Sequence, residues 1–379
     1  MSSTREEEIG DVEPDGEFTF QGYRRDGFGV GARNHLLVLP SVICSHVVAD
    51  RIAKQVTGAK SAAHDHGCAQ LGRDNDQTER TFVGVATNPN VAGTLVVGLG
   101  CEHVRSHEVK ARLEELGARV RELTIQGVGG TDATIEQGVD TARDMLKAAS
   151  ADRTVADASD LTVGIVSSDL GEGTISTADP LVGDFVDRIV GAGGRVVATG
   201  VERLLAHPDD ARSLATDDAL AGLENLLERH AGIPARETRI RRTAGELDLS
   251  TATRAWGDNQ IVDVLEYGER ARHDSGLAVV DAPSQFGEAA TGLAAAGAQV
   301  VVHVTDEGIP TGHPVAPVIK VTGNEETYEA LATDIDLNAN AASAGDLQDY
   351  VESVLDGQST LAEEHGLEDF AITRIGPST

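Results

Sequence analysis

The apolar run HLLVLP at His35–Pro40 decides the fold, because an amphipathic helical pattern over residues 47–56 follows it directly. The same unit recurs twice in the next hundred residues. A strand run at residues 93–99 is followed by a helical pattern at 104–116, and a strand run at 119–125 is followed by a helical pattern at 132–149. Alternation of strands and helices is typical of a parallel sheet that is covered by helices. Residues 20–150 therefore predict an N-terminal α/β domain.

A second domain follows a break in this pattern. Residues 151–160 lack an apolar face and predict a linker, whereas residues 1–19 are polar and acidic and predict a flexible arm. A helix is predicted to start with Asp179 as its N-cap and Pro180 in its first turn. Other strand-like runs occur at 161–166, 195–199, 277–281, 299–304 and 317–321. Other helical patterns occur at 208–230, 287–296 and 348–355. With residues 161–379 as the second domain, we expect two Rossmann-like α/β domains with largely parallel sheets.

Acidic side chains dominate the composition. The chain has 31 basic and 62 acidic residues, a net charge of −31 that argues against nucleic acid and anionic membranes as partners. Only five of the basic residues are lysine. This excess of acidic residues, together with the scarcity of lysine, predicts a protein adapted to a salt-rich cytosol in which charges are screened. The alternative is an ordinary acidic protein. No apolar stretch approaches the roughly 18 residues of a spanning helix, and the first residues lack a signal core. We therefore expect a cytoplasmic protein with three reduced cysteines.

The loops that follow the predicted strands carry most of the chemistry-bearing side chains. Residues 64–70 (HDHGCAQ) place His64, His66 and Cys68 within five residues, and imidazole and thiolate both bind divalent transition metals. A buried loop without metal is an equally good interpretation of this motif alone. GLGCEH at residues 98–103 ends another strand and brings Cys101, Glu102 and His103 to the same edge of a parallel sheet.

Three further motifs are candidates for substrate binding. GFGVGARN at residues 27–34 offers Arg33 for a carboxylate, although a glycine-rich turn with a structural arginine is the more ordinary interpretation. GVGGT at 127–131 is no dinucleotide motif, because Asp132 occupies its sixth position; it offers backbone N–H groups to an anion or is a plain turn capped by Thr131. Lys320 is either a specific cation near the substrate or a buried structural lysine.

Taken in order, these motifs resemble those of one family, the altronate/galactarate dehydratases, which also includes the large subunit of sulfolactate sulfo-lyase. The resemblance extends from residue 22 to residue 377. It rests on GYRRDGFGVGARNHLLVLPSV (22–42), on His64, Gly67, Cys68 and Gln70, and on GLGCE (98–102), GGT (129–131), TADP (177–180), QIVDVLEYGE (260–269), TGLAAAGAQVVV (291–302) and APVIKVTGN (316–324).

The resemblance implies a metal-dependent hydro-lyase, with Fe²⁺ or Mn²⁺, that dehydrates a sugar acid to a 2-keto-3-deoxy acid. We expect His64, Cys68 and Glu102 to hold the metal and His66, His313 and Lys320 to act in proton transfer or charge stabilisation. The expected substrate contacts are Arg33, Asn34, Gln70, Gly129, Gly130 and Thr131. Full-length members carry an N-terminal SAF-like domain that is absent here, which implies a separate small SAF-domain subunit; we also expect a homo-oligomer.

Two loops depart from the family pattern. Residues 166–171 (VSSDLG) and the stretch 244–256 lack the lysines and the cysteine that the family places there. These departures leave open a sulfo-lyase acting on a sulfolactate-like acid, or a non-catalytic scaffold subunit. Retention of the motifs around Cys68 and Glu102 favours an enzyme.

Overall fold

The computed structural model describes residues 18–70, 72–149, 152–231 and 238–375. In the N-terminal part, four parallel strands have the order β4-β3-β5-β6, with bounds β3 (His35–Pro40), β4 (Ala59–Ser61), β5 (Val91–Gly98) and β6 (Val120–Thr124). Their helices are α1 (His46–Ala53), α2 (Arg73–Ala86), α3 (Ser106–Glu115), α4 (Ile125–Val128) and α5 (Thr131–Ala148). Leu36 and Val38 pack with α1 and α5, while Leu37 and Leu39 pack with α2 and α3. Both faces of β3 are therefore covered, which is why its sequence is continuously apolar.

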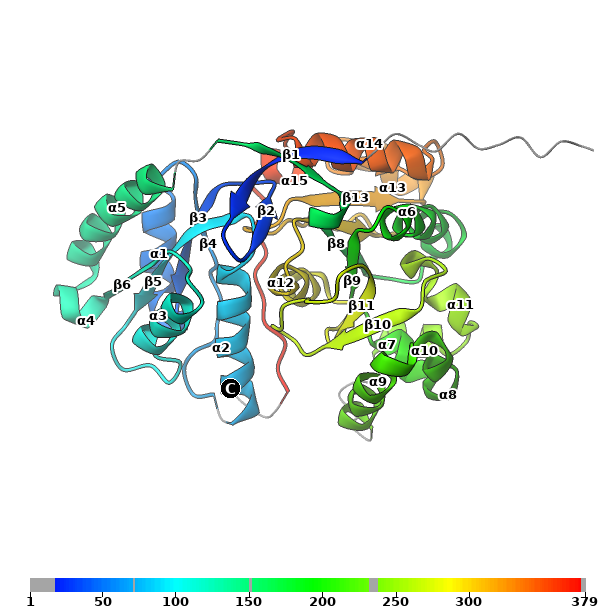
Figure 1. Ribbon diagram of the computed structural model, residues 1–379, viewed down its shortest axis with the longest axis horizontal. Coiled ribbons are helices and arrows are strands. Elements are labelled where there is room, and N and C mark those ends of the chain that lie inside the picture. Colours follow the sequence, from blue (N-terminus) through cyan, green and yellow to red (C-terminus); the bar gives the residue numbers. More distant parts are fainter. Residues whose placement is uncertain (1–17, 71, 150–151, 232–237, 376–379) are drawn as a thin grey trace, which may run out of the picture.

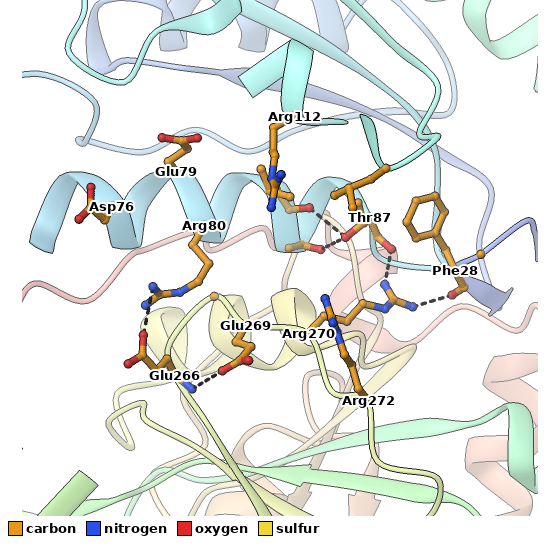
Figure 2. Close-up of a pocket in the computed structure, with 15 residues that line it drawn as sticks. Phe28, Asp76, Glu79, Arg80, Thr87, Arg112, Glu266, Glu269, Arg270 and Arg272 are labelled. Carbon is orange, nitrogen blue, oxygen red and sulfur yellow. Dashed lines mark hydrogen bonds and ion pairs between the residues drawn. The ribbon is translucent and has the colours of Figure 1, made fainter. Parts of the chain in front are cut away.

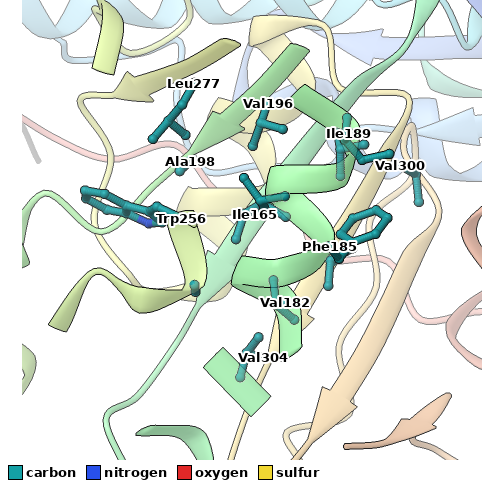
Figure 3. Packing of buried hydrophobic residues seen from close by; sticks show 14 of the residues in the cluster. Ile165, Val182, Phe185, Ile189, Val196, Ala198, Trp256, Leu277, Val300 and Val304 are labelled. Carbon is teal, nitrogen blue, oxygen red and sulfur yellow. The ribbon is translucent and has the colours of Figure 1, made fainter. Parts of the chain in front are cut away.

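The larger sheet has seven parallel strands in the order β10-β11-β9-β8-β12-β13-β14. The bounds are β8 (Thr162–Ser167), β9 (Arg195–Ala198), β10 (Ile261–Leu265), β11 (Gly276–Val280), β12 (Val300–Val304), β13 (Val318–Thr322) and β14 (Leu337–Asn338). One face packs against α6, and Figure 3 shows Val182, Phe185 and Ile189 of this helix among the side chains of the strands. The predicted fold class, two α/β domains with largely parallel sheets, is confirmed.

The helices around this sheet are α6 (Asp179–Gly191), α7 (Glu202–Ala206), α8 (Pro208–Ala211), α9 (Asp217–His230), α10 (Arg239–Ala244), α11 (Leu249–Ala252), α12 (Phe286–Ala296), α13 (Glu325–Ala330), α14 (Ala344–Leu355) and α15 (Leu361–Glu364). The single helix predicted over 208–230 is wrong, because a 3₁₀ turn at Arg212–Leu214 separates α8 from α9. Thr216 then caps α9 by accepting a hydrogen bond from the Ala219 N–H. Asp179 is not an N-cap, because a π-helical turn, Thr174–Ala178, runs directly into α6.

A third, antiparallel sheet of order β2-β1-β7 lies across the top of both domains (Figure 1). It consists of β1 (Thr19–Arg25), β2 (Gly29–Gly31) and β7 (Thr154–Asp157). Part of the predicted linker, residues 151–160, is thus a strand that pairs with β1. Residues 1–17 of the predicted arm lie outside the described residues, and none of the described helices is long and apolar enough to cross a membrane.

The two domains share a continuous apolar core, in which α2 packs against α12. A Cβ on Gly84 would lie 2.9 Å from the Cβ of Ala295, so only glycine allows this approach of the two helices. After α15 the chain runs back along α2, between the two domains in Figure 1. There the Gln77 side chain donates to the Thr373 carbonyl at 2.6 Å. The C-terminal residues therefore complete the packing of the N-terminal domain.

Candidate functional site

Four loops gather at the carboxyl edge of the four-stranded sheet, and hydrogen bonds between backbones hold them together. The Ile43 N–H donates to the His66 carbonyl at 2.8 Å, and the Gly67 carbonyl accepts from the His103 N–H at 3.1 Å. The Gln126 N–H donates to the Leu99 carbonyl at 3.1 Å. In the order β4-β3-β5-β6 the direction of winding changes between β3 and β5, and ligands of open α/β sheets bind at such a switch point. This edge is therefore the first candidate site.

Cys68 stands on an unusual turn within this edge. Gly67 has φ +91°, and a Cβ there would lie 2.0 Å from the Ser41 carbonyl oxygen, so the loop requires glycine. On the other side, Ala69 has φ +56° and is the only described non-glycine residue with positive φ. Backbone strain of this kind clusters at functional sites. The turn leaves the Cys68 thiol exposed at the surface.

All three cysteines lie at this edge. Cys44 follows β3, Cys68 follows β4, and Cys101 follows β5, and each is a free, exposed thiol. The sequence interpretation missed Cys44 as a site residue. Part of the signal was present, because Cys44 and Cys101 each come a few residues after a predicted strand, whereas β4, which precedes Cys68, was not predicted.

His64 points into the protein. Its Nε2 donates to the Pro40 carbonyl at 2.7 Å, and its Nδ1 accepts from the His66 N–H at 3.1 Å. The ring packs on Phe82 with centroids 4.8 Å apart. Burial lowers the pKa of His64 to about 4, so the ring is neutral. Because both ring nitrogens are engaged, this arrangement offers no lone pair to a metal.

Glu102, His66 and Gln70 brace the same loops. Glu102 accepts from the Gly100 N–H at 2.6 Å and from the Ser41 hydroxyl at 3.0 Å. Burial raises the pKa of Glu102, but hydrogen bonds outweigh it and hold the pKa below its usual value. The His66 Nδ1 and the Gln70 Nε2 are 2.8 Å apart, and burial lowers the pKa of His66. The Gln70 Oε1 accepts from the Gly67 N–H at 3.0 Å, so these side chains shape the loop.

The predicted ligands do not converge on one ion. Among the described residues, no group of three or more His, Cys, Asp or Glu side chains is arranged to hold a metal ion. The reason is local, since the ring nitrogens of His64 and the carboxylate of Glu102 are used in hydrogen bonds that hold the loops. As they stand here, His64, Cys68 and Glu102 do not fit a single Fe²⁺ or Mn²⁺ ion.

Arg33 and Asn34 connect distant parts of the chain. The Arg33 guanidinium binds Glu363 through two hydrogen bonds of 2.8 Å, from Nε and Nη2. Its remaining N–H groups donate to the carbonyls of Ala32, Val354 and Gln358. All five donors are therefore used within the protein, and none is left for a substrate carboxylate. Asn34 accepts from the Arg25 guanidinium at 2.5 Å and has the same structural role.

The residues 129–131 remain open to solvent. Gly129 and Gly130 have φ +106° and +119°, and nothing lies within 4 Å of a Cβ built on either. Their N–H groups donate to the Ile125 carbonyl, which ends α4. Thr131 begins α5, whose first-turn N–H groups face the same edge and keep their capacity for an anion.

A second candidate site lies at the carboxyl edge of the large sheet, centred on the buried Arg203. Its Nη2 donates to the Ser167 carbonyl at 2.8 Å, and its Nε donates to the Ala252 carbonyl at 2.8 Å. The guanidinium thus joins the two loops, 166–171 and 244–256, that depart from the family pattern. A Cβ on Gly200 would lie 2.4 Å from the Arg203 Nη1, which is why the chain needs glycine at φ +102° there.

Asp179 is fully buried beside this arginine. Burial raises the pKa of Asp179 to about 7, although the Arg203 guanidinium and the Ser167 hydroxyl lower it in part. A carboxyl that titrates near neutral pH is suited to proton transfer. A pocket of about 510 Å³, lined by the adjacent Pro180 and by Arg254, opens next to this position. The sequence had indicated only a helix cap here.

His313 and Lys320 are both buried, and the structure places them differently. The Phe370 ring links the two predicted halves of the site, because its centroid lies 6.1 Å from that of His64 and 5.7 Å from that of His313. Burial lowers the pKa of His313 to about 3. Lys320 lies on β13 beside His303 of β12, and its ammonium has no hydrogen-bond partner among the described residues. Burial lowers its pKa, while Asp336 and Asp334 raise it.

Comparisons with known proteins cover nearly the whole chain. The family described as "D-galactarate dehydratase/Altronate hydrolase, second domain" matches residues 22–150, and "D-galactarate/Altronate dehydratase, C-terminal" matches residues 250–378. Altronate dehydratase of Bacillus subtilis is 30% identical over 94% of this chain and 78% of its own length. The chain belongs to the altronate/galactarate dehydratase family. The (2R)-sulfolactate sulfo-lyase subunit beta of Chromohalobacter salexigens is 29% identical, over 94% of this chain and 97% of its own length.

Within this dehydratase-family chain the two candidate sites relate differently to the family. All four loops of the cysteine-bearing edge fall inside residues 22–150, the matched second domain. Asp179 and Arg203 lie between the two matched segments. The cysteine-bearing edge is thus the part of the site that the family descriptions cover.

A large pocket of about 980 Å³ lies elsewhere, between α2, α3 and residues 266–272. Figure 2 shows that two of its arginines are engaged within the protein: Arg80 pairs with Glu266 at 3.1 Å, and Arg270 donates to the carbonyls of Phe28 and Thr87. None of the predicted site residues lines it. We assign this pocket to the junction between the domains rather than to chemistry.

Proposed function

We propose that this chain is a lyase that dehydrates a sugar acid of the altronate or galactarate type to a 2-keto-3-deoxy acid. The observation that carries the proposal is the 30% identity with an altronate dehydratase along 94% of the chain. In this reaction a proton leaves carbon 2, the hydroxyl on carbon 3 departs as water after protonation, and the resulting enol becomes the ketone.

The chain's own residues supply a proton-transfer group for this reaction. Asp179, with its pKa raised to about 7, takes the proton from carbon 2. Arg203 is held by four hydrogen bonds to the loops around it, and its charge stabilises the developing enediolate. The Fe²⁺ or Mn²⁺ ion expected from the sequence finds no single-ion site among the described residues, so no step is assigned to it here.

The name of one relative supports a second candidate function. The chain spans 97% of a protein named as the beta subunit of a sulfo-lyase, but 78% of the altronate dehydratase of Bacillus subtilis. The name of this relative, a beta subunit, supports a partner subunit, which we propose to be a small SAF-domain chain. It also supports cleavage of a carbon–sulfur bond in a sulfolactate-like acid, which needs the same removal of a proton next to a carboxylate.

The test is a substrate panel under anaerobic conditions, with and without a candidate small SAF-domain subunit. Altronate and galactarate are assayed for the 2-keto-3-deoxy acid and (2R)-sulfolactate for sulfite. We expect one acid to turn over, and Asp179→Asn to lower kcat by about 10²-fold or more. Asp209→Asn, which removes a carboxylate from an exposed side chain of α8, is the matched control and should keep wild-type activity. Failure with every acid and both chain combinations would favour the scaffold alternative.

A further inference from the structure

We propose that Cys44, Cys68 and Cys101 together bind a four-iron iron–sulfur cluster at the carboxyl edge of the four-stranded sheet. Cysteine is among the residue types most often buried, because its side chain packs as a small hydrophobe. Here every cysteine of the chain is exposed, and all three lie on one edge. Packing therefore gives no reason for these residues at these positions.

Backbone hydrogen bonds join the three loops that carry these cysteines. Cys44 is next to Ile43, whose N–H donates to the His66 carbonyl at 2.8 Å. Cys68 is next to Gly67, whose carbonyl accepts from the N–H groups of His103 and Val104 at 3.1 and 3.3 Å. Cys101 lies two residues before His103. The loop that carries Cys68 is thus hydrogen-bonded on one side to the loop of Cys44 and on the other to that of Cys101.

The chemistry of the donor set selects the cofactor. Thiolates are soft ligands that favour zinc, copper(I) and iron–sulfur clusters over ions that prefer oxygen. A mononuclear site needs its ligands on one ion, and no three such side chains among the described residues are so arranged. In a cluster each thiolate binds a different iron, so the sulfurs stand farther apart than the ligands of a single ion.

Three cysteines would leave one iron of the cluster without a thiolate. That iron can bind an oxygen of the substrate and act as a Lewis acid. This role in turnover rests on the proposed lyase function, whereas cluster binding itself does not. The first turn of α5, which has no side-chain cap, also follows a strand at this edge and offers N–H groups to a carboxylate.

The test uses the full chain purified anaerobically and supplied with iron, sulfide and a thiol reductant, then desalted. We expect about four irons and four acid-labile sulfides per chain, with the broad visible absorption of iron–sulfur charge transfer. Cys44→Ser, Cys68→Ser and Cys101→Ser should each lose most of the iron, sulfide and absorption, while circular dichroism stays unchanged because the side chains are exposed. His107→Ala, an exposed residue of α3, is the control and should retain the cluster.

Two results would overturn the inference: iron bound without labile sulfide, or a full cluster in Cys44→Ser. A cluster of only two irons would overturn the four-iron assignment and, with it, the open iron. A wild-type chain that binds the cluster but turns over none of the acids would count against the proposed function and not against the cluster. Turnover by a chain shown to lack iron and sulfide would count against the cluster's role alone.

Discussion

Asp179 provides the sharpest test of the structure through stability, because its carboxyl is fully buried and must ionise there. Burial raises its pKa from 3.8 to about 7, with partial opposition from Arg203 and Ser167. A shift of roughly three units corresponds to about 4 kcal/mol between the two protonation states. The folded protein holds this proton more tightly than the unfolded chain does. Its contribution to stability is therefore complete below about pH 4 and is lost as the pH rises through 7.

The perturbation is Asp179→Asn, which removes the titration while keeping the shape of the side chain. Integrating the linkage between pH 5 and pH 8 gives a loss of about 3 kcal/mol in the wild type from this group alone. Urea unfolding at both pH values measures the free energy of unfolding for wild type and variant. We expect the variant to lose about 3 kcal/mol less than wild type, because the other titrating groups cancel in the difference.

Asp209→Asn supplies the control, because the carboxylate of Asp209 is exposed. The free energy of unfolding of this variant should have the same pH dependence as that of the wild type. If wild type and Asp179→Asn lose the same free energy between pH 5 and pH 8, then Asp179 does not ionise in a buried site and the reasoning fails. Its assignment as the proton-transfer group would fail with it.

Three further predictions test other parts of the structure. Arg33→Ala should lower the free energy of unfolding by about 3 kcal/mol in urea titrations, because it leaves the partly buried Glu363 without its bidentate partner. An effect below about 1 kcal/mol would show that the ion pair does not form in solution. Lys320→Met should lower kcat but leave the melting temperature unchanged or higher. The reason is that a buried ammonium without a hydrogen-bond partner is replaced by an apolar side chain of similar length. A large drop in the melting temperature would instead identify the lysine as structural. Dialysis from molar salt into dilute buffer should lower the melting temperature and the circular dichroism signal, because a net charge of −31 is then unscreened; full stability without salt would argue for an ordinary acidic protein.

Most strands of the two parallel sheets could be predicted from the sequence because helices bury both of their faces, whereas β4, β10 and β14 were not predicted. His35–Pro40 was located to the residue, and the cores of β5, β6, β12 and β13 were found within one or two residues. Helix ends were harder. The segment 208–230 has one amphipathic period throughout, and only the cap at Thr216 shows where the chain breaks. The helix Arg73–Ala86 was missed, because its first half is almost entirely polar and its buried face is set by α12.

The site could be predicted as a set of loops but not as a set of ligands. Parallel strands deliver the loops after β4 and β5 to one edge, and the hydrogen bonds at the Gly67 carbonyl confirm that these loops meet. Which way a side chain points is decided by its neighbours. His64 turns inward because the Pro40 carbonyl and the Phe82 ring are there to receive it, and neither partner is close to it in the sequence. The environment of Asp179 was missed for a similar reason, since the π-helical turn that runs into α6 directly before it has no clear sequence signal.

The return of the C-terminal residues along α2 sets an order of events during synthesis. Gln77 and His64 emerge from the ribosome some 300 residues before their contacts Thr373 and Phe370. Until then, the part of the surface of the N-terminal domain that these residues cover is exposed to solvent. We therefore expect the nascent chain to depend on chaperones until the C-terminal residues have been synthesised. The amides of the N-terminal sheet should acquire full protection from hydrogen exchange only after the chain is released.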